Sequence, residues 1–131
     1  WVYSTSSASI VKRLNNYELI YYTEKKMPWP LSNRDVVMQM KLVLDTVAGT
    51  LIMTAHSIEN MVPLKSGVVR VPASEVTWRV STILSGTMKI EYSAQADPGG
   101  TVPAWVTNMF LTKGPYETFT NLRKQLENKG D

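Results

Sequence analysis

The chain has 131 residues, of which 44% are hydrophobic and 19% are charged, a balance typical of one folded globular domain. No apolar run approaches the ~20 residues that a membrane-spanning helix needs, and no secretory signal pattern is present. The absence of cysteine excludes disulfide bonds, thiolate nucleophiles and the common cysteine-based zinc sites. The net charge of +3 comes from scattered lysines and arginines, so we expect no nucleic-acid partner. Because the chain begins with Trp1 instead of Met, the missing signal assigns no compartment, and a cytoplasmic location is only a default.

The first predicted elements are two strands, over residues 8–14 and 17–26. They flank Asn15-Asn16, a residue pair that tolerates the positive φ of a tight turn. We therefore expect a hairpin at the start of the chain.

A proline-framed loop, Pro28-Trp29-Pro30-Leu31-Ser32-Asn33-Arg34-Asp35, separates this hairpin from the next strand. Proline fixes its own φ and biases the residue before it towards extended backbone, which predicts a stiff loop. Trp29, held between two prolines at the mouth of a strand, suits a gate over an apolar site. A simple hydrophobic contact under the loop explains the same residues.

The clearest strand runs from Val36 to Leu44, where every even-numbered residue is apolar and the odd positions include Gln39 and Lys41. A period of two predicts a strand with one buried face. The following strand, over 51–58, is apolar on both faces, so periodicity does not orient it. It contains His56, the only histidine of the chain, for which a structural role is more common than a catalytic one.

Two later strands form a predicted hairpin around Ser85-Gly86. Apolar side chains occupy the even positions of residues 76–84, apart from one threonine, and the alternation continues through residues 87–96. With a short strand over 68–71, these segments predict a long antiparallel sheet with one polar face.

The pattern changes after Asp97-Pro98-Gly99-Gly100, a turn cluster that ends the last strand. Apolar residues then recur at helical intervals, which predicts an amphipathic C-terminal helix containing Trp105, Met109, Phe119, Leu122 and Leu126. Gly114-Pro115 is predicted to kink or break this helix midway. Many strands followed by one long helix make an α+β protein in which the helix covers the sheet.

Several spaced motifs follow one another along the chain: the 28–35 loop, Gly67-Val68-Val69-Arg70, Trp78, the 97–100 turn, and then Pro103, Trp105 and Asn108. In this order they resemble the START domain, the steroidogenic acute regulatory protein-related lipid transfer family. The resemblance covers essentially the whole chain but begins partway into the family pattern. We therefore expect a single START-like domain over residues 1–131 that lacks the family's N-terminal helix and first three strands.

The resemblance implies a helix-grip fold of the SRPBCC or Bet v 1-like kind, in which a curved antiparallel sheet wraps a long C-terminal helix and encloses a hydrophobic cavity. Function in this family is the binding, and often the transfer between membranes, of one lipid. The expected cavity lining follows from the resemblance and from inward strand parity, and comprises Tyr21, Met38, Met40, Val76, Trp78, Ile90 and Tyr92. Methionine suits such a cavity because its thioether adapts to variable acyl chains.

The resemblance also implies a gate, formed by the 27–33 loop and the C-terminal helix. Its expected residues are Trp29, Trp105, Asn108, Met109 and Phe119. Arg34 and Asp35 resemble a paired structural element that pins the loop to the sheet. Tyr21 and Met40 stand where some sterol-binding members carry a buried acid and arginine, which argues against a sterol and against a charged head group at these positions.

The expected partners are a lipid or another hydrophobic small molecule, and a transient contact with an anionic membrane surface. In the family, the strand corresponding to residues 87–96 pairs with the first of the elements that would precede Trp1. A strand without that neighbour exposes unpaired backbone groups, so self-association or strand swapping through residues 87–96 is a further expectation. We favour a fragment of a longer protein as its explanation.

Two classes of function follow. The first is a lipid-binding or lipid-transfer module without enzymatic activity. The alternative is a helix-grip enzyme of the polyketide cyclase or aromatase type, acting on a ring substrate through inward polar groups, for which the candidates are Tyr21, Thr82, Tyr92 and His56. Strand parity points the glutamates at 18, 24, 75 and 91 outward, so no acid–base residue is assigned. No catalytic residue, metal site or cofactor is expected.

Overall fold

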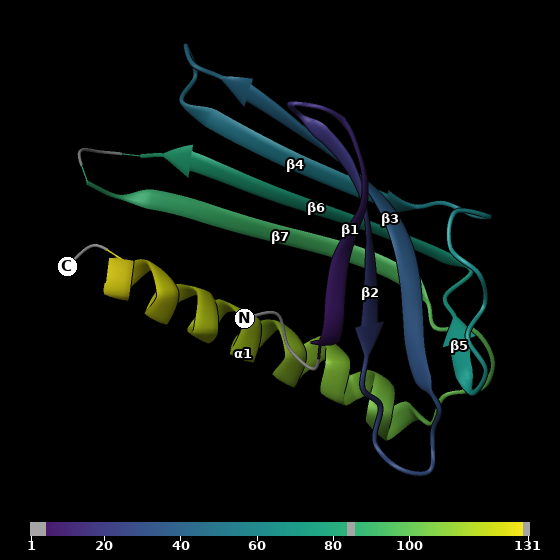
Figure 1. Cartoon of the computed structure of the whole chain (residues 1–131). Coiled ribbons are helices and arrows are strands. Elements are labelled where there is room, and N and C mark those ends of the chain that lie inside the picture. Colours follow the sequence, from purple (N-terminus) through teal and green to yellow (C-terminus); the bar gives the residue numbers. More distant parts are fainter. Residues whose placement is uncertain (1–4, 84–85, 130–131) are drawn as a thin grey trace.

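A curved sheet and one long helix make up the protein (Figure 1). The computed structural model describes residues 5–83 and 86–129, with the backbone alone for residues 109–112 and 129. The predicted α+β class, with a terminal helix lying across a curved sheet, is confirmed. The elements in chain order are β1 (Thr5–Asn15), β2 (Glu18–Lys25), β3 (Asn33–Asp45), β4 (Thr50–Ser57), β5 (Val68–Arg70), β6 (Ala73–Thr82), β7 (Met88–Asp97) and α1 (Ala104–Lys129).

The strands follow the order β1-β2-β3-β4-β6-β7, with every neighbouring pair antiparallel. The short β5 lies off this path and pairs in parallel with the beginning of β3. Within the described sheet, β7 has β6 as its strand partner and forms one edge. The expected self-association through this edge strand stays a prediction.

Cross-strand register defines an inner face that looks towards α1. One row on this face, contributed by four neighbouring strands, comprises Leu42, Met53, Trp78 and Tyr92. The ring of Phe119 on α1 contacts the last two members of the row. The sheet is therefore covered on the face that the alternating apolar residues predicted.

The register also orients β4, which periodicity alone did not. Met53 and Ala55 lie on the inner face, and Ala55 is buried. His56 lies on the outer face between Gln39 and Glu75, and its side chain is exposed. The direction of His56, which the sequence left open, is thus away from the face that α1 covers.

The outward direction predicted for four glutamates is confirmed by their cross-strand partners. Glu18 lies opposite Lys41, Glu24 opposite Asp35, Glu75 opposite His56, and Glu91 opposite Arg79. These rows belong to the face of the sheet that α1 does not cover.

Both predicted hairpins are present, with small differences at the turns. The first turn lies at 16–17, one residue later than predicted, because the side-chain oxygen of Asn15 accepts a hydrogen bond from the backbone N–H of Tyr17 at 2.8 Å. An asparagine that bonds two residues ahead fixes a turn at that point. The second turn includes Gly86 with φ of 82°, and Ser85 lies outside the described residues.

Of the predicted kink or break at Gly114-Pro115, the break is wrong, since α1 continues through both residues, and the kink stays a prediction. The carbonyl of Pro103 begins the helix by accepting hydrogen bonds from the backbone N–H of Val106 at 3.0 Å and of Thr107 at 3.2 Å. Val106 before the proline and Thr118 after it are both buried. Packing on both sides of the proline offsets its local cost, which is about 3 kcal/mol in a helix interior.

Candidate functional site

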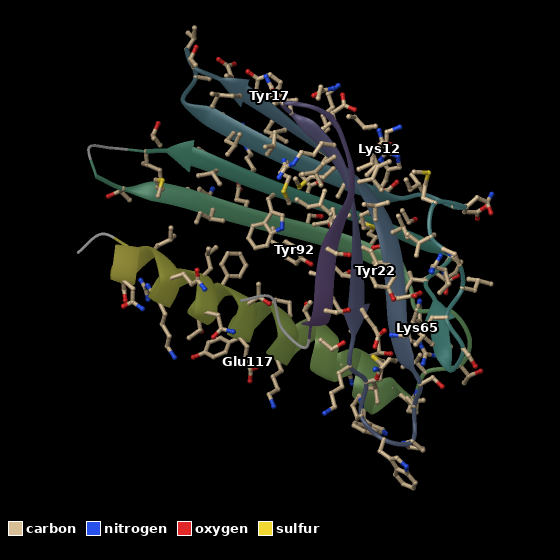
Figure 2. The ribbon with its side chains drawn as sticks, in the orientation of Figure 1. Lys12, Tyr17, Tyr22, Lys65, Tyr92 and Glu117 are labelled. Atoms are coloured by element: carbon tan, nitrogen blue, oxygen red, sulfur yellow. The ribbon has the colours of Figure 1, made fainter. Side chains whose placement is uncertain are left out.

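Three aromatic rings join the inner face of the sheet to α1. The ring centroids of Trp78 and Tyr92 are 4.6 Å apart, and Phe119 lies 5.5 Å from Trp78 and 6.4 Å from Tyr92. Figure 2 shows Tyr92 on the side of β7 that faces the helix. Phe119, predicted as part of a gate, thus lies in the contact between helix and sheet.

The structure places all seven predicted lining residues on the inner face. Tyr21 lies opposite the buried Met38, and the other five, Met40, Val76, Trp78, Ile90 and Tyr92, fall in the rows that continue across β4, β6 and β7. Burial raises the pKa of the Tyr21 hydroxyl, and the proximity of Tyr92 raises it further. Burial also raises the pKa of Tyr92. Both phenols are therefore neutral near pH 7, and the role of this face in ligand binding stays a prediction.

Of the expected gate residues, Phe119 takes part in that contact, whereas Trp29, Trp105 and Asn108 are exposed. Trp29 is 90% exposed at the tip of the loop between β2 and β3, where the N–H of Leu31 donates to the carbonyl of Pro28 at 3.0 Å. Trp105 and Asn108 are exposed on the first turns of α1, and the Met109 side chain lies outside the described residues. Trp29 points into solvent and does not cover the inner face in this structure.

Arg34 and Asp35 do not pair with each other, which corrects the expectation of a paired element. Successive residues of a strand point to opposite faces, so the two side chains diverge. The Arg34 guanidinium donates to three carbonyls, Ser32 at 2.6 Å, Pro98 at 3.2 Å and Gly99 at 3.0 Å. It thereby ties the 26–32 loop to the turn that precedes α1.

Asp35 pairs instead with Arg70 of β5. Its carboxylate is 2% exposed and accepts from Arg70 Nε at 2.7 Å, from Arg70 Nη2 at 3.2 Å and from the Tyr22 hydroxyl at 2.9 Å. Burial raises the pKa of Asp35, but the hydrogen bonds from Arg70 and Tyr22 outweigh it and leave the pKa below its ordinary value. Burial and the bond to this carboxylate raise the pKa of Tyr22 to about 12.

Arg70 extends this network to the segment between β4 and β5. Its Nη1 donates to the carbonyl of Val62 at 3.1 Å, and its Nη2 donates to that of Pro63 at 3.2 Å. The Arg70 guanidinium thus connects the irregular segment between β4 and β5 to β3. A hollow of about 550 Å³ opens beside Arg70, between residues 58–64 and 70–72, apart from the inner face.

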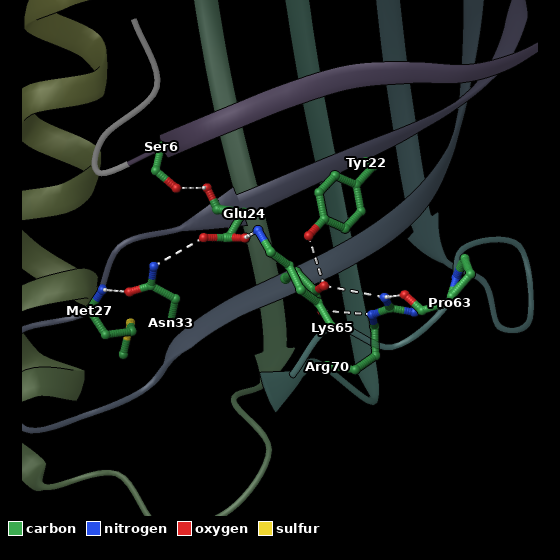
Figure 3. Close-up of polar contacts among 9 residues, drawn as sticks. Ser6, Tyr22, Glu24, Met27, Asn33, Pro63, Lys65 and Arg70 are labelled. Carbon is green, nitrogen blue, oxygen red and sulfur yellow. Dashed lines mark hydrogen bonds and ion pairs between the residues drawn. The ribbon is translucent and has the colours of Figure 1, made fainter. Parts of the chain in front are cut away.

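A second polar cluster lies at the base of the loop between β2 and β3, residues 26–32, which we call the Trp29 loop (Figure 3). Glu24 accepts from Lys65 Nζ at 2.8 Å and from Asn33 Nδ2 at 3.0 Å, and the Asn33 carbonyl oxygen accepts from the backbone N–H of Met27 at 3.2 Å. The hydrogen bonds from Lys65 and Asn33 lower the pKa of Glu24. Sequence reasoning assigned no role to Tyr22, Glu24, Lys65 or Arg70. Strand parity placed Glu24 on the outer face, but nothing marked Lys65, which lies in an irregular segment.

The described residues contain neither a metal-binding cluster nor a helix that could span a membrane. No group of three or more histidine, aspartate or glutamate side chains lies in an arrangement that could hold a metal ion there. The one helix of that part of the chain lacks the length of apolar sequence that a membrane crossing requires.

The whole sequence, residues 1–131, matches the family model of the START domain. The chain belongs to the START domain family. An uncharacterized protein of Pseudomonas aeruginosa is 27% identical over 129 residues, and the match covers 98% of this chain and 63% of that protein. Phosphatidylcholine transfer protein of Bos taurus is 27% identical over 114 residues, covering 85% of this chain and 54% of the relative. The START chain thus spans between about half and two thirds of the length of these curated relatives.

Solved structures of START proteins share the fold. A STAR-related lipid transfer protein from Xanthomonas axonopodis superimposes with a TM-score of 0.81 at 25% identity, covering 97% of this chain and 70% of that one. Human StAR-related lipid transfer protein 5 superimposes with a TM-score of 0.84 at 19% identity, covering 100% of this chain and 64% of that one. The predicted helix-grip fold is therefore confirmed.

Proposed function

We propose that this START chain binds one hydrophobic lipid between the inner face of its sheet and α1, and that it carries the lipid between membranes. The observation that carries the proposal is the composition of the inner face. Its central row is Leu42, Met53, Trp78 and Tyr92, and the register of β2 to β7 directs every carboxylate of these strands to the other face. Apolar burial is the main driving force for holding a lipid there.

The relatives support the same proposal. Phosphatidylcholine transfer protein and the STAR-related lipid transfer proteins are named for lipid transfer, and they match nearly all of this chain. A phospholipid with two acyl chains is therefore the first ligand to test.

We place the gate at the 27–33 loop and the beginning of α1. The bonds from Arg34 to Ser32, Pro98 and Gly99 hold these two segments together, so a movement of one displaces the other. Trp29 and Trp105 are exposed in this region, and tryptophan favours the interface between membrane and water. The loop would open when its tryptophan enters that interface.

The cyclase alternative has less support in the structure. It needs polar groups that face a ring substrate, and His56 lies on the outer face. Tyr21 and Tyr92 remain as inner phenols, and their raised pKa values make them poor bases near pH 7. We therefore propose binding without turnover.

Native mass spectrometry of the protein purified from its own host tests lipid binding directly. We expect one lipid for each protein chain. Protein that is empty after purification, does not take up phosphatidylcholine from vesicles and turns over an aromatic polyketide would overturn the proposal in favour of the cyclase.

Substitutions of adjacent residues on opposite faces of β4 locate the ligand. Met53→Glu places a carboxylate on the inner face, whereas Thr54→Glu places one on the exposed outer face opposite Lys41. We expect Met53→Glu to reduce lipid occupancy at least about tenfold, since burying an uncompensated charge costs several kcal/mol. Thr54→Glu should leave occupancy unchanged. Equal occupancy in the two folded variants would place the ligand elsewhere.

Transfer of a fluorescent phosphatidylcholine between vesicles tests the gate. We expect Trp29→Ser to slow transfer while the fraction of lipid-loaded protein stays the same. Tyr17→Ser, which removes an exposed aromatic ring from the turn between β1 and β2, is the matched control and should transfer at the wild-type rate. Wild-type transfer by Trp29→Ser would exclude a role for this tryptophan in the gate.

A further inference from the structure

The two ends of the Trp29 loop are joined by one asparagine side chain. Glu24 is the last but one residue of β2, and Asn33 is the first residue of β3. The Asn33 amide donates to Glu24 Oε2 at 3.0 Å and accepts from the backbone N–H of Met27 at 3.2 Å. Because one partner is an acceptor and the other a donor, the orientation of the amide is defined. Hydrogen bonds made by the oxygen and by the nitrogen of the Asn33 side-chain amide therefore close the loop at its base.

The carboxylate of Glu24 also forms an ion pair with a lysine from a distant segment of the chain. Lys65 Nζ lies 2.8 Å from Glu24 Oε1, the oxygen that Asn33 does not use. The Glu24 side chain is 10% exposed, and the hydroxyl of Ser6 donates to its backbone carbonyl at 3.1 Å. Glu24 is thus fixed from several sides and links Lys65 to Asn33 (Figure 3).

Lys65 belongs to the segment between β4 and β5, residues 58–67, which is itself held by hydrogen bonds. Arg70 holds the carbonyls of Val62 and Pro63, and the carboxylate of Asp35 holds Arg70. The contacts continue from this segment through Lys65, Glu24 and Asn33 to the backbone of Met27, next to Pro28 and Trp29.

We propose that Glu24, Asn33 and Lys65 are positioning residues for the Trp29 loop, and that the 58–67 segment sets through them how readily the loop opens. The inference rests on the proposed gating of a lipid by this loop. Lys65 is the member most easily displaced, because its side chain is 61% exposed and the other end of the pair is buried. Losing Lys65 leaves Glu24 with one partner fewer and loosens the Asn33 amide that closes the loop.

The other end of β2 offers a matched control. Lys41 pairs with Glu18 across β2 and β3, and its side chain is 60% exposed, close to the value for Lys65. The Lys41–Glu18 pair has no contact with the Trp29 loop in the described structure, since Glu18 lies at the opposite end of the strand. Lys41→Met and Lys65→Met therefore remove equally exposed lysines from ion pairs at opposite ends of β2, and the pairs differ in length, 3.9 Å against 2.8 Å, and in their connection to the loop.

Hydrogen exchange followed by mass spectrometry tests the positioning role without a ligand. We expect peptides covering residues 26–32 to exchange about two- to fivefold faster in Lys65→Met than in the wild type, the range expected for loss of a partly exposed ion pair. Lys65→Arg should restore the wild-type rate, and Lys41→Met should not change it. A uniform increase across all peptides, or an equal increase in Lys41→Met, would overturn the inference.

A double-mutant cycle establishes that Lys65 acts through Glu24. Glu24→Gln keeps a hydrogen-bond acceptor for Asn33 and removes the charge that Lys65 meets. If the two residues act as one unit, the exchange rates of the double variant equal those of Glu24→Gln alone. Additive effects would show that Lys65 reaches the loop by another route and would overturn the chain of contacts.

Release of a fluorescent phosphatidylcholine from loaded protein to vesicles connects the loop to function. We expect faster release from Lys65→Met than from Lys41→Met, with equal loading of both before the assay. Faster loop exchange with unchanged release would overturn the control of opening by this segment. If neither variant nor the wild type loads any lipid in native mass spectrometry, the proposed function fails instead, and the exchange data still decide whether the three residues position the loop.

Discussion

Buried charges hold one end of the START sheet, whereas the described residues at the other end include no buried charge. The anchored end, where β2 and β3 meet β5, contains Glu24, Arg34 and Asp35, all buried and hydrogen-bonded. The open end, at the turns after β3 and β6, exposes five large apolar residues, Val43, Leu44, Val47, Ile83 and Met88. Hydrogen bonds are directional, so those at the anchored end restrict the positions of the backbone groups that they join. Substitutions of these exposed residues at the open end therefore remove little buried surface.

The largest effect is expected at the anchored end, from Arg70→Met. This change leaves the Asp35 carboxylate buried without its cation, and breaking a buried ion pair costs about 3 kcal/mol or more. Urea denaturation measures the loss. Arg79→Met is the control, because Arg79 and Glu91 form a half-exposed pair at 3.9 Å that should contribute less than about 1 kcal/mol. Equal losses in the two variants would remove the distinction between buried and exposed pairs.

A smaller effect is expected from Gly49→Ala, in the turn between β3 and β4 at the open end. Gly49 has φ of 65°, and a Cβ at this position would lie 2.5 Å from the hydroxyl oxygen of Thr82. The left-handed conformation costs a non-glycine residue about 1–2 kcal/mol. Thermal unfolding should show a lower Tm, and Gly49→Ala with Thr82→Ser, which keeps the hydroxyl, should remain as unstable. Wild-type stability of Gly49→Ala would show that this turn relaxes freely.

Tyr22→Phe changes the alkaline stability of the anchored end. The folded pKa of Tyr22 is about 12, above the ordinary value near 10, so its contribution is complete below pH 10 and is lost as the pH rises towards 12. We expect the variant to lose about 1 kcal/mol at pH 7, the usual net value of a hydrogen bond. Proton release on unfolding near pH 11 should fall by about one proton in Tyr22→Phe. An unchanged proton release would mean that Tyr22 titrates alike in both states.

The smallest effect is expected from Val47→Ser. Val47 is 98% exposed, and the structure gives its side chain nothing to pack against. We expect the free energy of unfolding to change by less than about 0.5 kcal/mol, as for most surface substitutions. Its backbone N–H donates to Asp45, and this bond survives the change. A loss above about 1 kcal/mol in urea denaturation would show that the open end is packed more tightly than its exposure indicates.

The sequence predicted the fold well where a period of two or an unambiguous turn residue governed it. The inner faces of β3, β6 and β7 followed directly from alternation, and the register places them in continuous rows. β4 carries apolar residues on both faces, so only its neighbours in the sheet could orient it. The continuity of α1 through Pro115 depended on tertiary packing on both sides of the proline, which local preference does not report.

The candidate site was predicted in part. The seven inner-face residues follow strand parity, which is a local property of the sequence. The anchored end brings Glu24 together with Lys65, and Asp35 together with Arg70, across separations of 41 and 35 residues. No local pattern encodes such pairs, and the adjacency of Arg34 and Asp35 suggested a pairing that alternate strand faces prevent.

The bonds of Arg34 also bear on how this START chain folds. They join the second residue of β3 to carbonyls that lie 64 and 65 residues further along the chain. Contacts over such separations require the intervening strands to be in place first, and closing so long a loop has an entropic cost before any bond forms. We therefore expect these bonds to be absent from the transition state for folding. Weakening them would then speed unfolding and leave the folding rate nearly unchanged, which makes Arg34 a determinant of how long the native state lasts.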